Sequence, residues 1–174
     1  MKRVLVTGNA GAGKSTFGRA LATRSGVPYF GLDGIVWRPG WQKTNRADRH
    51  EAEQAIASRD SWIVDGVSDE LLKAADTIVL PDVPRLLCIL RVLWRSLPYL
   101  FRSRPGLPER CPELLILPQV AKIIWKYPAT QRTKVFGETA ARPVTLFHIR
   151  NRAGYLAAMS SLHEGLTAAH ESSQ

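Results

Sequence analysis

The chain has 174 residues, of which 45% are hydrophobic and 22% charged, with 24 Lys and Arg against 15 Asp and Glu. This length predicts a single domain spanning residues 1–174, which can bury enough surface to fold without a disulfide or a metal. The composition excludes general disorder, collagen-like repetition and a disulfide scaffold. The net charge of +9 is unusual and favours anionic partners such as nucleotides, nucleic acid or acidic membrane.

The apolar segments and the cysteines predict where the protein resides. The first apolar run is too short for a signal peptide. The most apolar region, residues 86–101, contains Arg91 and Arg95, and two charges at mid-span would be costly in lipid. We therefore expect a buried amphipathic helix there, no membrane partner and a cytoplasmic location. Cys88 and Cys111 lack the paired spacing of zinc or redox motifs, which indicates reduced thiols.

Short apolar strands alternate with helical segments along the chain, which predicts a parallel sheet with helices on both faces. The expected fold class is α/β with five parallel strands, and ligands should bind beyond the carboxyl ends of these strands. The predicted strands are 4–7, 29–32, 62–64, 77–80 and 144–149, and the predicted helices are 15–25, 47–59, 86–97, 114–127 and 153–166, followed by a frayed polar tail from residue 170.

Residues 8–15 read Gly-Asn-Ala-Gly-Ala-Gly-Lys-Ser and match the complete P-loop pattern between a predicted strand and helix. Glycines let the backbone curl so that its N–H groups point at phosphate oxygens. Lys14 should reach the β- and γ-phosphates, Ser15 should coordinate Mg²⁺, and Thr16 should contact the α-phosphate. We predict a three-layer P-loop NTPase that uses ATP and Mg²⁺. Its nucleotide-binding residues are Gly8, Gly11, Ala12, Gly13, Lys14, Ser15 and Thr16.

Two aspartates follow predicted strands and suit phosphoryl transfer in a small kinase, which also fits the length of the chain. Asp65 should hold Mg²⁺ through water, and Gly66 beside it leaves room for an acceptor to approach. Asp33 should lie near the γ-phosphate and orient or deprotonate the acceptor. The alternative for Asp33 is a turn or a helix cap, and the alternative for Asp65 is an ordinary Asp-Gly turn.

The segment after the fourth predicted strand resembles adenylate kinases. Asp82-Val83-Pro84 followed by Arg91 and Arg95 has the spacing Asp-x-Pro-x6-Arg-x3-Arg. In that family the helix leads into a mobile lid, its first arginine packs on adenine and its second reaches the phosphates. The resemblance implies these roles for Arg91 and Arg95, and a helical, arginine-rich lid insertion over about 96–137. The alternative is that both arginines keep an apolar helix soluble.

A closer resemblance covers nearly the whole chain. Gly-Asn-Ala-Gly at 8–11, Trp-Arg-Pro-Gly-Trp at 37–41, Trp-Ile-Val-Asp-Gly at 62–66 and Leu-Pro-Glu-Arg-Cys-Pro-Glu at 107–113 occur in order. Together they resemble the bacterial adenylate-kinase-related proteins called DNA topology modulation proteins of the FlaR type. That family commonly has Asn where this chain has Val67 and Gly where it has Arg110. The missing Asn removes a polar contact to an acceptor.

Aromatic and basic residues extend the predicted acceptor site. Trp37 and Trp41 suit stacking on a flat acceptor and Arg38 suits an anionic group, although the tryptophans also suit anchoring a loop to the core. Arg102 and Arg104 lie in a proline-stiffened loop, which fits a closing lid, a grip on a nucleic-acid backbone or a solvated surface. The predicted substrate-binding residues are Asp33, Trp37, Arg38, Gly66, Arg102 and Arg104.

The leading hypothesis is an ATP- and Mg²⁺-dependent phosphotransferase that acts on a nucleotide-like or other small-molecule acceptor, with Lys14, Asp33, Arg91 and Arg95 as catalytic residues. The alternatives are a nucleotide-gated DNA-binding protein and a nucleotide-binding regulator without phosphotransfer. Residues 85–134 carry ten bases and two acids, a charge of +8, against +1 for the remainder. The surplus favours a local phosphate site and does not require nucleic acid. Monomer and dimer both stay open.

Overall fold

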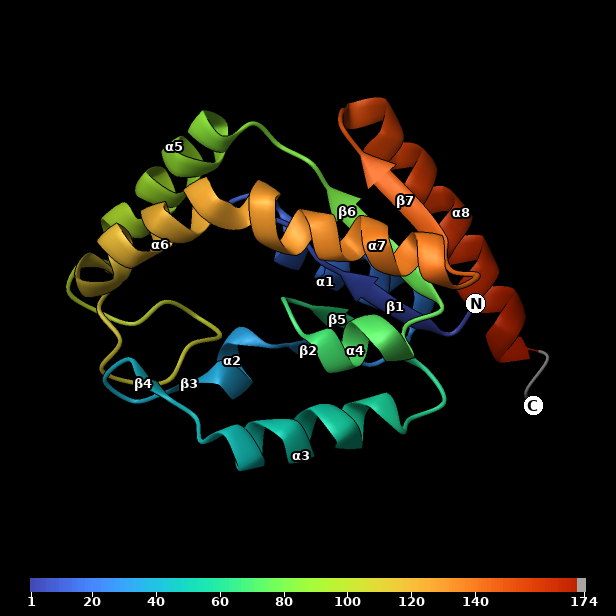
Figure 1. The fold of residues 1–174 in the computed structure, drawn as a ribbon, viewed down its shortest axis with the longest axis horizontal. Coiled ribbons are helices and arrows are strands. Elements are labelled where there is room, and N and C mark those ends of the chain that lie inside the picture. The colour runs from blue at the N-terminus through green and yellow to red at the C-terminus, as the bar shows by residue number, and fades with distance from the viewer. Residues whose placement is uncertain (172–174) are drawn as a thin grey trace.

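Five parallel strands form the central sheet, in the spatial order β2-β5-β1-β6-β7 (Figure 1). The computed structural model describes residues 1–171, and residues 172–174 lie outside the described part. This sheet confirms the predicted α/β class with five parallel strands. The strands are β1 (Arg3–Val6), β2 (Tyr29–Gly31), β5 (Trp62–Asp65), β6 (Thr77–Pro81) and β7 (Thr145–Ile149).

Alternation of side chains along β1 divides the core into two layers. Val4 and Val6 pack against α1 (Lys14–Ser25) and α8 (Arg152–Glu171), whereas Leu5 packs on the opposite face, and all three are fully buried. Successive side chains of a strand point to opposite faces, so a strand covered on both sides is apolar throughout. The helices on the opposite face are α3 (Arg46–Ala57), α4 (Asp69–Ala74) and α7 (Thr133–Ala141).

The strand order reverses at β1, which lies between β5 and β6. The register pairs Val6 at the end of β1 with Asp65 at the end of β5. Open parallel sheets bind ligands beyond the carboxyl ends of their strands at such a switch point. The loop of residues 8–13 and the two predicted acids therefore meet at one edge of the sheet.

Several short elements around this edge are not predicted from the sequence. A one-turn helix, α2 (Asp33–Val36), follows β2 and leads into an antiparallel hairpin of β3 (Trp37–Arg38) and β4 (Gln42–Lys43). These segments, together with α4 and α7, carry too few residues to show a clear periodicity. At the other end of the chain α8 continues through residue 170, where a frayed tail is predicted, to Glu171.

Two helices, α5 (Arg85–Ser96) and α6 (Glu113–Tyr127), lie side by side at one end of the molecule (Figure 1). Their common core includes Ala12 of the glycine loop, so the pair packs directly on that loop. The lid predicted over about 96–137 is largely helical. A 3₁₀ turn (Leu97–Tyr99) follows α5, and only residues 100–112, between that turn and α6, lack regular structure. Across residues 1–171, no helix combines the length and the apolar character that crossing a membrane needs.

Two leucines of α8 provide a matched test of this core. Leu162 is fully buried against β1, whereas Leu156 is 56% exposed. We expect Leu162→Ala to lower the free energy of unfolding by about 2–5 kcal/mol, because lost burial and the residual cavity add. Leu156→Ala should change it by less than about 0.5 kcal/mol. Urea denaturation followed by circular dichroism measures both, and equal losses would contradict the assigned face of α8.

Candidate functional site

The loop of residues 8–13 approaches its neighbours so closely that a side chain has no room at Gly11 and little room at Gly8. A Cβ atom on Gly11, whose φ is +78°, would lie 2.5 Å from the carbonyl oxygen of Cys88 on α5. A Cβ atom on Gly8 would lie 3.0 Å from the carbonyl oxygen of Pro81 at the end of β6. The loop is therefore a tight backbone cradle that leads into the N-terminus of α1, a geometry that suits phosphate.

Asp65 is a buried carboxylate at the end of β5 that accepts hydrogen bonds from two hydroxyl groups. Ser15 Oγ donates a hydrogen bond to Asp65 Oδ2, and the Tyr29 hydroxyl donates one to Oδ1 at 2.8 Å. Burial and the adjacent Asp65 carboxylate raise the pKa of Tyr29 to about 12, so this hydroxyl keeps its proton. Hard oxygen ligands are the ones that Mg²⁺ prefers. The oxygens of Ser15 and Asp65 therefore fit the predicted metal position.

Lys14 lies over the cradle, close to both acids of the site. Its Nζ donates a hydrogen bond to the carbonyl oxygen of Asn9 at 2.9 Å. Burial lowers the pKa of the Lys14 ammonium below its ordinary value, and the charges of Asp33 and Asp65 oppose that shift. A cation that has lost part of its hydration attracts an entering anion more strongly than one in bulk water. Lys14 is therefore well placed to meet a phosphate group.

A buried hydrogen bond ties the loop to α6. Asn9 is 4% exposed; its Nδ2 donates to the carbonyl oxygen of Ile124 at 2.9 Å, and its Oδ1 accepts the N–H of Ala10 at 2.9 Å. The helical donor for the Ile124 carbonyl would be residue 128, but Pro128 has no N–H. Asn9 supplies the missing donor, so the position of the P-loop is coupled to that of α6.

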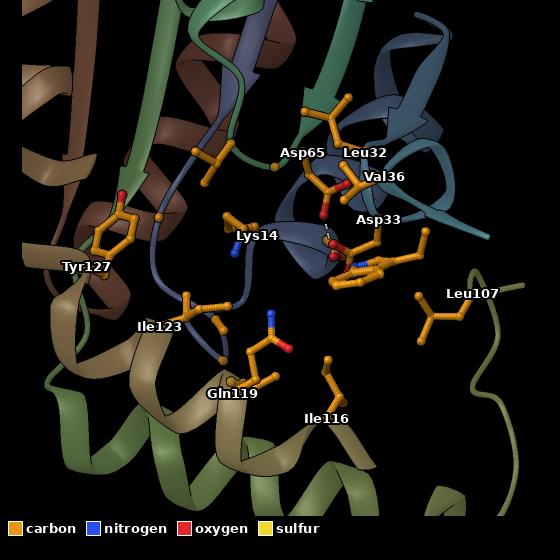
Figure 2. A pocket seen from close by; sticks show the side chains of 18 of the residues that line it. Lys14, Leu32, Asp33, Val36, Asp65, Leu107, Ile116, Gln119, Ile123 and Tyr127 are labelled. Atoms are coloured by element: carbon orange, nitrogen blue, oxygen red, sulfur yellow. Dashed lines mark hydrogen bonds between the residues drawn. The ribbon is translucent and has the colours of Figure 1, made fainter. Parts of the chain in front are cut away.

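A cavity of about 1220 Å³ opens in front of the loop. Lys14, Asp33 and Asp65 lie on one side of it, while Gln119 and Ile123 point into it from α6 on the other (Figure 2). This volume exceeds the roughly 300–1,000 Å³ of a pocket for one small ligand, so two ligands have room. The predicted loop residues that line this cavity are Gly8, Gly11, Gly13, Lys14, Ser15 and Thr16.

A second cavity of about 620 Å³ lies on the α5 side of the loop and is lined by Ala12. Arg91 contributes from α5, while Arg150 and Asn151 contribute from the chain after β7. Arg95, one helical turn beyond Arg91, lines both cavities. The two arginines singled out in the sequence therefore lie beside adjoining cavities on either side of the predicted phosphate site.

Arg104 links the irregular loop 100–112 to both sides of the larger cavity. Its Nη2 lies 2.7 Å from Asp33 Oδ2, and its Nε lies 2.7 Å from Glu113 Oε1. Glu113 is almost fully buried and also accepts a hydrogen bond from Ser96 Oγ at 3.0 Å. A buried carboxylate requires such partners. Arg104 therefore holds the loop against the cavity and pairs with Asp33, an acid of the site.

The Trp-Arg-Pro-Gly-Trp segment packs on the Cys-Pro-Glu segment. Trp41 Nε1 donates to the carbonyl oxygen of Pro112 at 2.8 Å, and the Trp41 N–H lies 3.4 Å from Cys111 Sγ. The rings of Trp37 and Trp41 meet edge to face with centroids 5.2 Å apart, and both line the larger cavity. The tryptophans therefore anchor the hairpin and also present indole surface to the cavity.

Two arginines predicted to bind substrate are not brought to the cavity. Arg38 pairs with Asp48 on the exposed surface, because side chains alternate along β3 and its neighbour Trp37 takes the cavity side. Arg102 is exposed and donates from Nε to the carbonyl oxygen of Pro98 at 2.8 Å. Of the predicted arginines, the larger cavity thus receives Arg95 and Arg104.

Arg49, on α3, lines the cavity and is not predicted from the sequence. Its Nε pairs with the buried Glu53 at 2.7 Å, and its Nη2 donates to the carbonyl oxygen of Val67 at 3.1 Å. Gly66 lines the same wall, where a Cβ atom would lie 2.7 Å from Leu32 Cβ. The spacing of Arg49 and Glu53 is a sequence signal for this contact, but such pairs are common on helix surfaces.

Arg110 has a left-handed backbone, with φ at +57°, immediately before Cys111. A residue with a Cβ atom loses about 1–2 kcal/mol in this conformation, whereas glycine does not. The FlaR-type sequence pattern, which this segment resembles, commonly has glycine here. The departure at Arg110 therefore falls where the backbone conformation favours glycine.

Neither a protein-family model nor a curated protein matches the sequence. The fold is similar to that of a shikimate kinase from Acinetobacter baumannii, solved with shikimate, at 18% identity and a TM-score of 0.56, covering 97% of this chain and 94% of that one. A shikimate kinase from Bacteroides thetaiotaomicron matches at 17% identity and a TM-score of 0.56, covering 95% and 98%. A gluconokinase from Sinorhizobium meliloti matches at 18% identity and a TM-score of 0.50, covering 95% of each chain.

The structural similarity establishes the fold. At identities this low it does not assign the acceptor. The parallel sheet with its flanking helices fits this similarity, which extends over nearly the whole length of both chains. The chain therefore has the α/β P-loop NTPase fold in the form found in small-molecule kinases.

Removing the Asn9 side chain tests the coupling of the loop to α6. We expect Asn9→Ala to lower the free energy of unfolding by about 1–3 kcal/mol, because the Ile124 carbonyl is left buried without a donor. The variant should also bind ATP more weakly. Asn45→Ala is the control, because Asn45 caps α3, lines neither cavity, and its loss costs about 1 kcal/mol. Urea denaturation and calorimetric titration measure both properties; unchanged stability in Asn9→Ala would contradict the coupling.

Replacing Arg110 tests its left-handed backbone conformation. We expect Arg110→Gly to raise the free energy of unfolding by about 0.5–1 kcal/mol, since relief of the left-handed strain exceeds the added chain entropy. Arg102→Gly is the comparison, because the backbone φ of Arg102 is not positive, so glycine there relieves no strain and should lower the free energy of unfolding. Chemical denaturation of the three proteins decides the matter. Destabilisation by Arg110→Gly would show that the conformation carries no strain.

Proposed function

We propose that this protein is an ATP- and Mg²⁺-dependent phosphotransferase that acts on a small-molecule acceptor. The observation that carries the proposal is one cavity lined by the P-loop cradle, by Lys14 and by the carboxylates of Asp33 and Asp65. Phosphoryl transfer needs positioning and charge neutralisation, with a carboxylate to orient or deprotonate the acceptor. The kinase fold of the structural neighbours supports this reaction class.

The nucleotide would lie along the P-loop with its base toward the smaller cavity. Backbone N–H groups of the loop and the Lys14 ammonium would bind the phosphates, and Arg91 would contact the base. Ser15 and Asp65 would hold Mg²⁺, which, when bound, neutralises charge on the phosphate oxygens. Arg95 lines both cavities, so it would lie beside the phosphates.

The acceptor would occupy the side of the larger cavity between the hairpin and α6. Asp33 would take the proton from an acceptor hydroxyl as that oxygen bonds to the transferred phosphorus and ADP leaves. Arg49 is supported by Glu53 and is suited to an anionic group of the acceptor, while Trp37 offers a flat apolar surface. This assignment gives Arg49 the role that the sequence suggested for Arg38.

The irregular loop 100–112 would act as a lid over the phosphates. Arg104 is held between Asp33 and Glu113, and an anion entering beside Lys14 would compete with Asp33 for it. Transfer of Arg104 from the carboxylate to a phosphate would neutralise charge and free Asp33 for the acceptor. A lid that closes in this way also excludes water from the reacting groups.

We also propose that the chain is related to the FlaR-type proteins. Two of the motifs on which that resemblance rests, at 37–41 and 107–113, contact each other through Trp41, Cys111 and Pro112. Paired motifs that form one substructure support the resemblance better than isolated matches do. The name of that family implies DNA binding, and no observation on the described residues points to DNA in particular.

An acceptor screen with ATP and Mg²⁺, in which phosphorylated product is detected by mass, tests the proposed function. Polyols, cyclic hydroxy acids, nucleosides and nucleotides form the panel. Lys14→Ala should abolish transfer, and Asp33→Asn should lower kcat by about 10²–10⁴-fold, the usual contribution of a general base. Arg38→Gln is the matched control and should keep wild-type activity, because Arg38 lies outside the cavity.

ADP release that no acceptor stimulates would contradict the kinase reaction. Tight binding of duplex DNA at physiological salt, with a steep decrease of affinity as salt rises, would instead favour a DNA-binding protein.

A further inference from the structure

The outer surfaces of α5 and α6 expose large apolar side chains to solvent. Trp94 of α5 is 78% exposed, and Phe101, in the loop that connects the two helices, is 85% exposed. Contiguous apolar surface of this kind marks an interaction site. The residues, which we call the α5–α6 apolar face, are Leu86, Leu90, Leu93, Trp94, Leu97, Phe101, Leu114, Leu115 and Trp125.

The apolar residues of α5 project away from the core. Cys88 and Val92 are buried against Ala12 of the P-loop and against α6. Two residues advance an α-helix by about 200°, so Leu90 and Trp94 point in nearly the opposite direction. α5 is therefore apolar on both its inner and its outer sides, and its outer side has no partner among residues 1–171 that buries it.

The two helices join their exposed residues into one surface. At one end the Arg85 guanidinium lies over the Trp125 ring, 5.1 Å from its centroid. At the other end the Leu114 N–H donates to the carbonyl oxygen of Leu100, next to Phe101, at 3.2 Å. The helices thus run antiparallel and side by side (Figure 1). Exposed apolar residues therefore lie close together at both pairs of helix ends, with Leu86 and Trp125 at one and Leu97, Phe101 and Leu114 at the other.

The charge around this face is positive. Residues 85–134 carry ten bases and two acids. Glu113 is buried and paired with Arg104, and Glu109 lies in the irregular loop, so neither helix exposes an acid. Arg102 follows Phe101, and Lys122 lies about one helical turn from Trp125; both are exposed.

We propose that the α5–α6 apolar face binds in the plane of an anionic lipid bilayer. A basic amphipathic helix with Leu, Trp and Phe on its apolar side inserts at the boundary between headgroups and acyl chains. The arginines that exclude a membrane-spanning α5 do not exclude this arrangement, because Arg91 and Arg95 line the cavities beside the P-loop and are not part of the apolar face. The proposal goes beyond the phosphotransferase and alters the expectation, drawn from the sequence, of no membrane partner.

Charge favours lipid over a second copy of the chain. A two-fold dimer through this face would bring the same patch of both copies together. The bases around one face would then oppose the bases around the other, with no exposed acid on either helix to pair with them. Like charges in juxtaposition disfavour association, whereas anionic headgroups neutralise them.

Flotation of the full chain with lipid vesicles tests the proposal. We expect binding to vesicles of phosphatidylglycerol and phosphatidylcholine, weaker binding to phosphatidylcholine alone, and a decrease with salt because screening weakens the electrostatic attraction. Substituting both Leu90→Gln and Trp94→Gln should reduce the vesicle partition constant at least about tenfold, since burial of one such side chain exceeds that factor. Leu156→Gln, an exposed leucine on α8, is the matched control and should bind as the wild type does.

Both substituted positions are exposed, so thermal denaturation of the variants should match that of the wild type. No flotation with anionic vesicles at low salt would overturn the proposal, as would equal binding by the wild type and the double variant. A wild-type dimer in sedimentation equilibrium that the double variant dissociates, without vesicle binding, would assign the face to a second copy instead. None of these readouts depends on phosphotransfer.

Discussion

The backbone of the P-loop lies against α5 with no room for a side chain at Gly11, and the rest of the site depends on this contact. A Cβ atom at Gly11 would lie 2.5 Å from the Cys88 carbonyl oxygen, so any other residue there would push α5 away. Since α6 packs on α5, the far wall of the larger cavity would move with it. Glycine here allows the packing of α5 on the loop and would also allow the proposed close approach of phosphate.

Polar contacts connect the P-loop, α6 and the loop 100–112. Pro128 leaves the Ile124 carbonyl without its helical donor, and Asn9 takes that place from the loop. Glu113, at the start of α6, holds Arg104, which in turn reaches Asp33. An anion that enters the cradle therefore acts on groups that also position α6 and the lid. The walls of the cavity and its proposed catalytic groups are thereby linked.

The basic residues of 85–134 lie on two different surfaces, the wall of the larger cavity and the outer surface beside the apolar face. Arg95 and Arg104 face the larger cavity, where phosphate is the expected partner. Arg102 faces outward beside the apolar face, where an anionic surface is the proposed partner. A charge of +8 over this segment therefore describes two surfaces with different chemistry. Net charge predicts the sign of a partner and leaves the number of partners open.

The sequence by itself determined the α/β class, the strands of the sheet, the P-loop and Asp65 at a strand end, because periodicity and the glycine pattern are local properties. It did not determine which arginines reach the cavity. Arg38 is turned outward by alternation in a hairpin that Trp41 anchors through Pro112, a residue distant in the chain. Arg49 is positioned by Glu53 and by the Val67 carbonyl, which no spacing rule singles out. Side-chain direction in irregular segments depends on contacts between distant residues, and those contacts exist only in the folded chain.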